Sequence, residues 1–410
     1  MTVDRKTWVI APRDPLVFGN GVPPAAFVER RGALPPPSTI AGMVRAAFVA
    51  ERGHVTPERA RELLERISVR GPWMRGPAAD GEAVLWVPSP HDGVRARDAF
   101  QRATVAEPGE DEGVLWPESA TEDLRLVHLP ERGTDGAKTE AIDRDTPLWP
   151  LSAAVRWALG ETVTPAQVAP RQRGEDPTGV IGREHRVHVA IDNTTGTAQP
   201  GALFSSPGTR FERDFKLAIE VTARDESGAA PPGTVVLGGE SRLSFRGVDE
   251  SAAFPAFDMY EPQYVKALDR RPRGLRVQLL TPACVRCDVK PGAQAWRPAP
   301  AVAGIELVAV CIPGFSAISG WDLQAAEGRG APRAVRRLVP AGSVYYYALP
   351  KLSGEALKKA LLDACRQLWG RPIAPDEVRT PSDEQQHLAP SARDGFGLAL
   401  PGFWFDGGIG

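Results

Sequence analysis

Residues 34–48 read LPPPSTIAGMVRAAF, in which three prolines and two hydroxyl residues stand directly before an apolar repeat. The apolar side chains follow the spacing of one buried helical stripe: Ile40, Met43, Val44, Ala47 and Phe48. Proline lacks an N–H and holds the residue before it extended, so the helix is expected to open at Ser38 or Thr39. The apolar stretch TWVIAP, residues 7–12, predicts a strand before this helix.

The start of this helix has two interpretations. A helix N-terminus carries unpaired N–H groups and about half a positive charge, so it suits a phosphate as well as a capping side chain. Ser38 and Thr39 would cap the helix in the first interpretation and would also hold a phosphate in the second. The sequence leaves both open.

The length and charge of the chain limit its possible functions. At 410 residues it is long for one domain and comfortable for two, each with its own core. The formal net charge of -2 gives no global attraction to nucleic acid, so any nucleic-acid site must be local. The first residues are charged and no stretch approaches the roughly 18 apolar residues of a membrane helix. We therefore expect a cytoplasmic protein with no membrane partner.

The four cysteines do not form the framework of a disulfide-rich protein. Cys284 and Cys287 are spaced like half of a zinc site, but no second pair has that spacing. Zinc would bind only if Cys311 and a histidine completed the set. We expect no metal and no cofactor.

The remaining elements divide into two sets. The first set continues with a helix, a hairpin, a second helix and three strands: residues 57–67, 74–87, 151–159, 186–192, 211–222 and 240–246. The second set has three strands, a helix and a closing strand: residues 274–282, 305–312, 338–349, 353–369 and 395–404. Each set approximates βαββαβ, which predicts an α+β protein of two ferredoxin-like (RRM-like) domains in tandem. The domains would cover 1–255, with an insertion at about 52–184 that includes an acidic stretch at 105–123, and 256–410.

Alternation within residues 186–192 suggests which of their side chains face a core. Val187, Val189 and Ile191 share one face and are expected to be buried, whereas Arg186 and His188 share the other. The three tyrosines at 345–347 are interpreted as core residues of a strand, because alternate ones face opposite ways and the RNA-recognition signature is absent.

Seven stretches, in this order, resemble one known family: APRDPLVFGNG, PPPSTIAGMVRAAF, RVHVAIDNTTGTAQPGALF, LGGESRLSFR, PGFSAISGWDL, VPAGSVYYYAL and GFGLALPGFW. The family is the third subunit of type III-B (Cmr) CRISPR effector complexes, within the RAMP superfamily, and the resemblance spans residues 8–404 in patches. It implies a non-catalytic RNA-binding subunit that holds the 5′ handle of the CRISPR RNA in antiviral defence. It also implies contact with the large Cas10-type subunit and with the backbone RAMP subunits.

The resemblance further implies which residues approach the guide RNA. The segment before the first helix would do so, with a phosphate at its hydroxyl residues and an arginine nearby. Glycines in the last strand leave one face bare, which fits either close approach of RNA or packing on a neighbouring domain. The expected RNA-binding set is Ser38, Thr39, Arg45, Arg186, His188, Asn193, Thr194, Arg242, Gly395 and Gly397.

An enzyme of the same superfamily is the alternative. Some RAMP relatives cleave RNA without a metal by using a histidine as general acid or base, so a CRISPR RNA-processing endoribonuclease stays possible. Of the six histidines, only His185 and His188 lie in a stretch that resembles the family. The sequence contains no P-loop, HExxH or GxSxG motif, and we expect a non-catalytic subunit.

Overall fold

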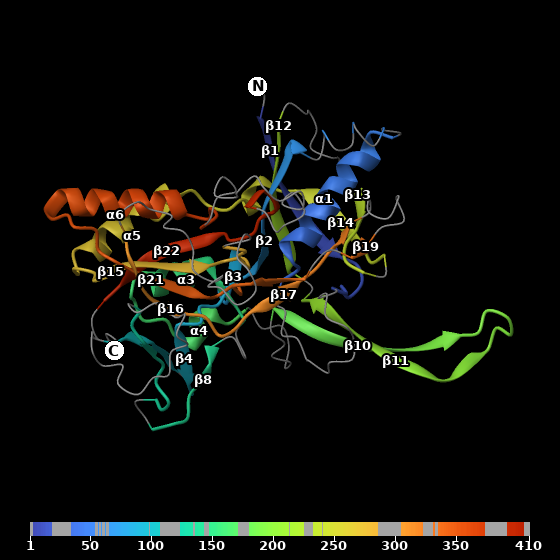
Figure 1. The fold of residues 1–410 in the computed structure, drawn as a ribbon, viewed down its shortest axis with the longest axis horizontal. Coiled ribbons are helices and arrows are strands. Elements are labelled where there is room, and N and C mark those ends of the chain that lie inside the picture. Colours follow the sequence, from blue (N-terminus) through green and yellow to red (C-terminus); the bar gives the residue numbers. More distant parts are fainter. Residues whose placement is uncertain are drawn as a thin grey trace.

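The structure is a computed structural model, and within the residues that it describes the protein is a mixed α+β molecule with mostly antiparallel sheets and few helices (Figure 1). The described residues are 3–18, 34–53, 56, 59, 62, 65–97, 99–106, 124–133, 136–142, 147–170, 180–212, 214–224, 233–239, 241–285, 305–322, 331–332, 335–373 and 392–405.

The largest sheet has seven strands in the order β13–β14–β1–β12–β2–β3–β9, and each neighbouring pair is antiparallel. Its strands are β1 (Val3–Pro12), β2 (Ile67–Pro77), β3 (Ala83–Pro88), β9 (Leu148–Pro150), β12 (Lys216–Arg224), β13 (Gly233–Val236) and β14 (Leu243–Val248). β1 lies between two strands from much later in the chain, because Trp8 is opposite Ile219 of β12 and Val248 of β14.

The predicted helix is confirmed as α1 (Pro37–Glu51), which packs on one face of this sheet. Phe48 stacks on Trp8 of β1 with the ring centroids 5.7 Å apart. The helix begins at Pro37, one residue before the predicted start. Proline is tolerated there because the N–H of the first helical residue has no partner within the helix.

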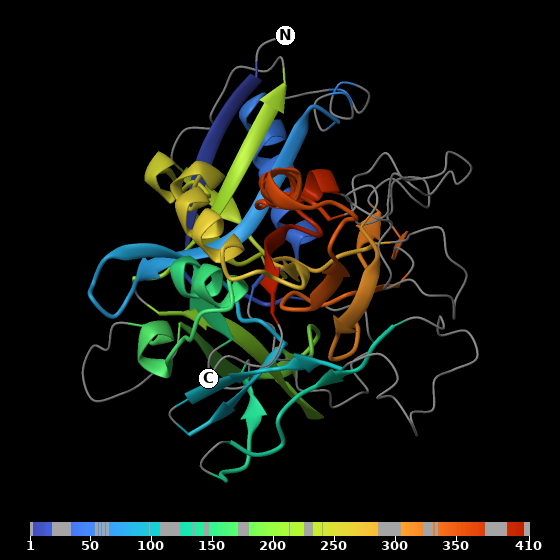
Figure 2. The same ribbon diagram turned by 90° about the vertical axis from the view of Figure 1, so that its left-hand side faces the viewer.

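The second sheet has four strands in the order β16–β21–β15–β22, all in antiparallel pairs. These strands are β15 (Gly274–Leu279), β16 (Leu307–Cys311), β21 (Val344–Ala348) and β22 (Ala399–Trp404). Helices α5 (Glu261–Leu268) and α6 (Gly354–Leu368) contact each other and bury side chains in the core around this sheet; Figure 2 views α6 nearly end-on. Tyr345, Tyr346 and Tyr347 of β21 are buried, as the sequence predicted.

The other elements are short, apart from one long hairpin. The hairpin consists of β10 (Ile181–Ile191) and β11 (Ala198–Phe211). The short strands are β4 (Gly93–Ala96), β5 (Ala99–Arg102), β6 (Thr104–Val105), β7 (Val127–His128), β8 (Glu140–Ala141), β17 (Ser316–Ile318), β18 (Trp321–Asp322), β19 (Ala331–Pro332) and β20 (Arg336–Leu338). The short helices are α3 (Leu151–Ala158) and α4 (Pro165–Val168), with 3-10 turns at Glu250–Ala252, Phe257–Met259 and Ala392–Asp394.

Two strand predictions need correction, and the stretch expected as an insertion contributes to the main sheet. The strand expected at 211–222 is divided, because β11 ends at Phe211 and β12 begins at Lys216. The strand expected at 395–404 begins only at Ala399, since Gly395 and Gly397 adopt positive φ angles of 92° and 74° that are incompatible with a strand. The stretch expected as an insertion, 52–184, supplies β2, β3 and β9 to the main sheet.

One hydrophobic core joins the two sheets. It contains Val87 of β3 and Leu275 of β15, together with Ala154 and Ala158 of α3. α3 packs closely on the last strand, because a Cβ added at Gly402 of β22 would lie 2.2 Å from the carbonyl oxygen of Ala158. The two halves of the chain therefore share buried surface across the boundary that the sequence placed near residue 255.

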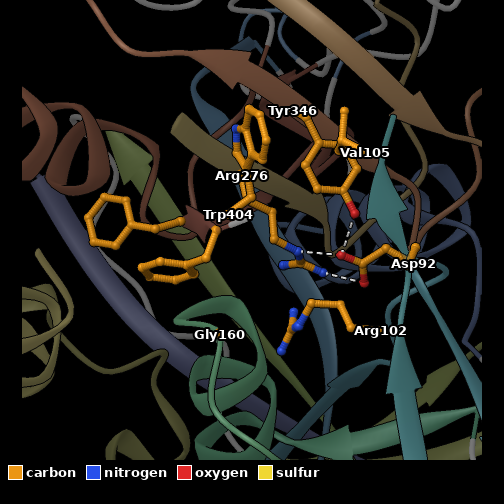
Figure 3. A pocket seen from close by; sticks show the side chains of 10 residues that line it. Asp92, Arg102, Val105, Gly160, Arg276, Tyr346 and Trp404 are labelled. Carbon is orange, nitrogen blue, oxygen red and sulfur yellow. Dashed lines mark hydrogen bonds and ion pairs between the residues drawn. The ribbon is translucent and has the colours of Figure 1, made fainter. Parts of the chain in front are cut away.

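A buried ion pair links the residue directly before β4, Asp92, to the second sheet (Figure 3). Arg276 of β15 donates to the Asp92 carboxylate from Nε to Oδ2 at 2.6 Å and from Nη2 to Oδ1 at 2.7 Å. The Tyr346 hydroxyl and the Trp157 indole N–H also donate to Asp92, at 2.8 and 2.9 Å. Burial alone would raise the pKa of Asp92, but the charge and hydrogen bonds of Arg276 outweigh it and hold that pKa well below its usual 3.8.

Candidate nucleic-acid interface

Two connecting segments and part of β11 meet at one end of the main sheet, and we call them the loop cluster: residues 13–18, 208–210, 237–239 and 241–243. Leu16 and Thr209 exchange backbone hydrogen bonds at 2.8 and 2.7 Å. The Gly239 N–H donates to the Val17 carbonyl at 2.7 Å, and the Arg13 N–H donates to the Leu243 carbonyl at 3.1 Å. The end of β1, the base of the β10–β11 hairpin and the β13–β14 turn therefore lie side by side.

The β10–β11 hairpin extends from this cluster away from both sheets (Figure 1). Its tip is an ordered turn, because the Asp192 carboxylate accepts from the N–H groups of Thr194 at 2.7 Å and Thr195 at 3.3 Å. Those two hydrogen bonds lower the pKa of Asp192, so the carboxylate stays ionised and keeps the turn in place. Asn193 and Thr194 lie in this turn, and both are exposed.

The burial expected for one face of this hairpin is wrong. Val187, Val189 and Ile191 are 67%, 41% and 50% exposed, and Leu203 of the partner strand is 71% exposed. Alternation separates two faces of any strand, but it indicates a buried face only where something packs on it. No core forms on this face, because the hairpin stands clear of the two sheets.

Arg186 and His188 lie on the other face of β10 and are both half-buried. The Arg186 side chain is 38% exposed and forms an ion pair from Nε to Glu184 Oε1 at 2.7 Å. That neighbour partly neutralises the guanidinium charge along the hairpin. His185 is exposed on the opposite face, so the two histidines of the enzyme interpretation do not point to one site.

The capping interpretation of the α1 start is wrong. The residue before the helix is Pro36, and no side chain caps the helix. Instead the Pro36 carbonyl accepts from the N–H groups of Thr39 at 3.0 Å and Ile40 at 3.2 Å. Ser38 and Thr39 are half-buried in the first helical turn, where their hydroxyl groups are not used as caps.

Arg45 does not lie at the helix start. It is seven residues beyond Ser38, which is about 10 Å along the helix axis. Its Nη2 pairs with Asp394 Oδ1 at 2.5 Å, and both side chains are mostly buried, so Arg45 joins α1 to the 3-10 turn before β22. The expected support of a phosphate at Ser38 therefore has no geometric basis.

Gly395 and Gly397 are buried directly after that turn. A Cβ at Gly395 would lie 2.5 Å from the Gly71 carbonyl oxygen of β2, and its φ of 92° would strain any other residue. The close approach that Gly395 permits is therefore to a strand of the same chain, whereas a Cβ at Gly397 would make only ordinary contacts, with Ala283 at 3.5 Å and Ile373 at 3.8 Å. This matches the packing interpretation of the bare segment.

Arg242 lies in the β13–β14 turn and is half-buried within the loop cluster, where its carbonyl accepts from the Leu237 N–H at 2.9 Å. Of the expected RNA-binding residues, Arg242 thus lies beside the base of the hairpin, and Arg186, His188, Asn193 and Thr194 lie progressively farther out along it. Arg45, Gly395 and Gly397 form a separate group around the 3-10 turn.

The zinc hypothesis gains no geometric support. Cys287 lies outside the described residues, and among the described ones no group of three or more metal-binding side chains occurs. The Cys311 thiol donates to the His91 carbonyl at 3.1 Å, and burial, with the nearby Asp92 charge, raises its pKa to about 12. A protonated thiol is a poor zinc ligand.

In the part of the chain that the structure describes, no helix is long and apolar enough to cross a membrane.

Comparison with known proteins identifies the family. The family of the CRISPR-associated protein (Cas_Cmr3) matches residues 8–404. The chain belongs to this family. The Cas_Cmr3 assignment confirms the resemblance that the seven stretches predicted from sequence. No curated protein matches the chain.

Several solved structures are similar to this Cas_Cmr3 chain at low identity. Two are cryo-EM structures of the type III-B Cmr-beta complex bound to cognate target RNA, without and with AMPPnP. Their matching chains are 15% and 14% identical, with TM-scores of 0.43 and 0.45, over 83% of this chain and 86% of theirs. A third, a crystal structure of a Csm3–Csm4 subcomplex of type III-A, is 10% identical with a TM-score of 0.33, over 83% and 92%.

Proposed function

We propose that this Cas_Cmr3 protein is a non-catalytic subunit of a type III-B effector complex that holds the 5′ handle of the CRISPR RNA. The observation that carries the proposal is the loop cluster, which packs the base of the hairpin against the turn that holds Arg242, while Arg186, His188, Asn193 and Thr194 follow along the hairpin to its tip. Half-buried and exposed polar side chains on an ordered hairpin suit contacts to the phosphates and edges of a single-stranded RNA.

The strand orders support a tandem of ferredoxin-like units. In the main sheet, β14–β1–β12–β2 has the order fourth, first, third and second strand, with α1 between the first and second. In the second sheet, β22–β15–β21–β16 repeats this order, with α6 between the third and fourth strands. Each unit thus keeps one of the two helices of βαββαβ among the described residues.

The charge of the chain fits a subunit that works with partners. With a formal net charge of -2 and its arginines paired with carboxylates at several sites, the isolated chain lacks the charge needed for strong RNA affinity. We propose that the remaining surface contacts the large Cas10-type subunit and the backbone RAMP subunits. Guide and target are then read by base pairing, as in other RNA-guided complexes.

Replacing Arg186 by glutamine is expected to weaken guide retention in the assembled complex by about tenfold, because one charged hydrogen bond to a phosphate is lost. The dependence on salt should also weaken, by about 0.7 in the slope of log affinity against log salt for each lost phosphate contact. Filter binding across a salt series measures both quantities. Lys359→Gln on exposed α6 removes the same charge far from the loop cluster and should change neither.

The rival function gives a different result. If the purified protein cut repeat RNA, and His185→Ala or His188→Ala stopped the cut, the chain would be an endoribonuclease. If Arg186→Gln changes neither guide retention nor the salt slope, Arg186 of the hairpin does not contact the RNA.

The double substitution Ser38→Ala with Thr39→Ala tests the phosphate interpretation of the α1 start. Because neither side chain caps the helix, its effect on the free energy of unfolding should stay within about 0.5 kcal/mol. If the α1 start holds a phosphate, guide retention should fall equally for all guide sequences. Ser353→Ala before α6 is the control, since that residue also makes no cap hydrogen bond. If the double variant retains the guide as well as the wild type does, the segment before α1 only starts the helix and binds no phosphate.

A further inference from the structure

A small cavity lies beside the buried ion pair, between the second sheet and the segment that carries β5 (Figure 3). Its volume is about 20 Å³, enough for one water-sized particle. Four polar side chains line it: Asp92, Arg102, Arg276 and Tyr346. The other lining residues are apolar or small: Ala103, Val105, Gly160, Phe403, Trp404 and Phe405.

The guanidinium groups of Arg102 and Arg276 both line this cavity, and each has a buried N–H group that makes no hydrogen bond within the described residues. Arg276 is completely buried and uses Nε and Nη2 on Asp92, so its Nη1 points away from the carboxylate. That Nη1 has no hydrogen-bond partner within the described part of the chain, and neither does the buried Nη1 of Arg102. Figure 3 shows the Arg102 side chain on the same side of the ion pair, beside the Arg276 guanidinium.

The charges around the cavity do not balance. Asp92 supplies one negative charge against the two positive charges of Arg102 and Arg276. Burial lowers the pKa of Arg102 to about 10, and the charge of Arg276 adds to this effect while Asp92 opposes it. Arg102 therefore stays charged at neutral pH. Arg276 and the Nη1 atom of Arg102 are buried although the Arg102 side chain as a whole is half-buried, so a negative group beside these two donors would compensate positive charge that solvent reaches only in part.

We propose that the cavity binds a monoatomic anion, chloride, held between Nη1 of Arg102 and Nη1 of Arg276. An anion accepts from both donors and balances the local charge. A single small ion is the ligand that a volume of about 20 Å³ suits best.

A water molecule would satisfy this cavity less well. It would accept from one or both guanidinium groups, but its own two protons would need acceptors. The Asp92 oxygens already accept from four donors, on Arg276, Tyr346 and Trp157. The Tyr346 proton is spent on Asp92, and the Trp404 indole N–H donates to the Tyr347 carbonyl at 2.9 Å. The lining side chains thus present hydrogen-bond donors and apolar groups but no free acceptor, which favours an anion, because an anion accepts hydrogen bonds and donates none.

The bound ion would connect two parts of the chain. Arg102 ends β5 and is held by the Trp157 ring, 3.9 Å from its guanidinium carbon, and by the Glu161 carbonyl at 3.3 Å. Arg276 lies in the centre of the second sheet. The site is separate from the loop cluster, so it does not depend on the proposed RNA contacts.

Thermal melting of the full chain tests this site, with sodium gluconate replaced stepwise by sodium chloride at constant ionic strength. Gluconate is too large for the cavity. Above the dissociation constant, the melting temperature should rise by about 1.5 °C for each tenfold increase in chloride. Arg102→Met should abolish this rise. Arg337→Met, which also removes an arginine from an aromatic ring, that of Phe315 at 4.7 Å, should retain it.

A melting temperature of the wild type that does not respond to chloride would overturn the proposal, as would an equal response in Arg102→Met. If Arg102→Met does not fold, crystals of the wild-type chain grown with bromide give an independent answer. Anomalous density within hydrogen-bonding distance of both guanidinium groups is expected. Its absence would assign the cavity to water.

Discussion

Arg276→Met is expected to reduce the free energy of unfolding by about 3 to 5 kcal/mol, because it leaves the Asp92 carboxylate buried without its charge partner. The side chains of Asp92 and Arg276 are almost completely buried, so solvent cannot replace the lost interaction. Tyr346 and Trp157 still donate to the carboxylate but carry no charge, and the positive charge of Arg102 acts on it only through space, without the two short hydrogen bonds that Arg276 makes. Urea unfolding of the purified chain measures the change.

The double variant Asp92→Leu with Arg276→Met is the control, since it removes both charges. It should be more stable than Arg276→Met alone, because replacing a whole buried ion pair by apolar groups costs less than breaking it. Acid gives a second readout. The pKa of Asp92 is lowered on folding, so the contribution of the pair is complete above about pH 5 and is lost as the pH falls below the usual carboxyl range. An Arg276→Met variant as stable as wild type would contradict this account.

Gly395→Ala is expected to destabilise the fold by about 3 kcal/mol in the absence of any RNA. The added Cβ would meet a backbone carbonyl oxygen of Gly71, which cannot rotate away, and the positive φ adds strain. Differential scanning calorimetry of the isolated chain measures the loss. If the glycine served only RNA, the isolated chain would melt like the wild type.

Gly42→Ala is the matched control for this substitution. Gly42 lies inside α1, and a Cβ there would have no heavy atom within 4 Å. Replacing an interior helical glycine by alanine should therefore stabilise the chain by about 0.5 to 1 kcal/mol. The opposite signs of the two glycine variants would show that the environment of each position, and not loss of glycine itself, decides the result.

Local periodicity predicted α1, α3 and α6 but missed α5, and it did not predict the exposure of the hairpin. The stripe of α1 lies within one element of sequence, so its spacing alone indicated a buried face, and the structure confirmed it. The alternation in β10 was equally regular. Its apolar side chains are exposed because burial depends on what packs above the strand, and that information lies elsewhere in the chain.

Contacts between distant residues were not predictable from sequence. Asp92 and Arg276 look like ordinary surface residues in their own segments, and only the pairing of β15 with its neighbours brings them together. The glycines at 395 and 397 did suggest a close approach. The sequence could not name the approaching group, which at Gly395 is Gly71 of a strand more than three hundred positions earlier.

The position of β1 between β12 and β14 has a consequence for synthesis of the protein. When the ribosome has completed β1, both strands that flank it remain to be made, because β12 begins at Lys216 and β14 at Leu243. At roughly 5 to 20 residues per second, the first strand waits about 10 to 40 s with both edges unpaired. Its apolar residues Trp8, Val9 and Ile10 are exposed to other nascent chains during this interval. Protection by a chaperone would therefore matter most before residue 216 leaves the ribosome.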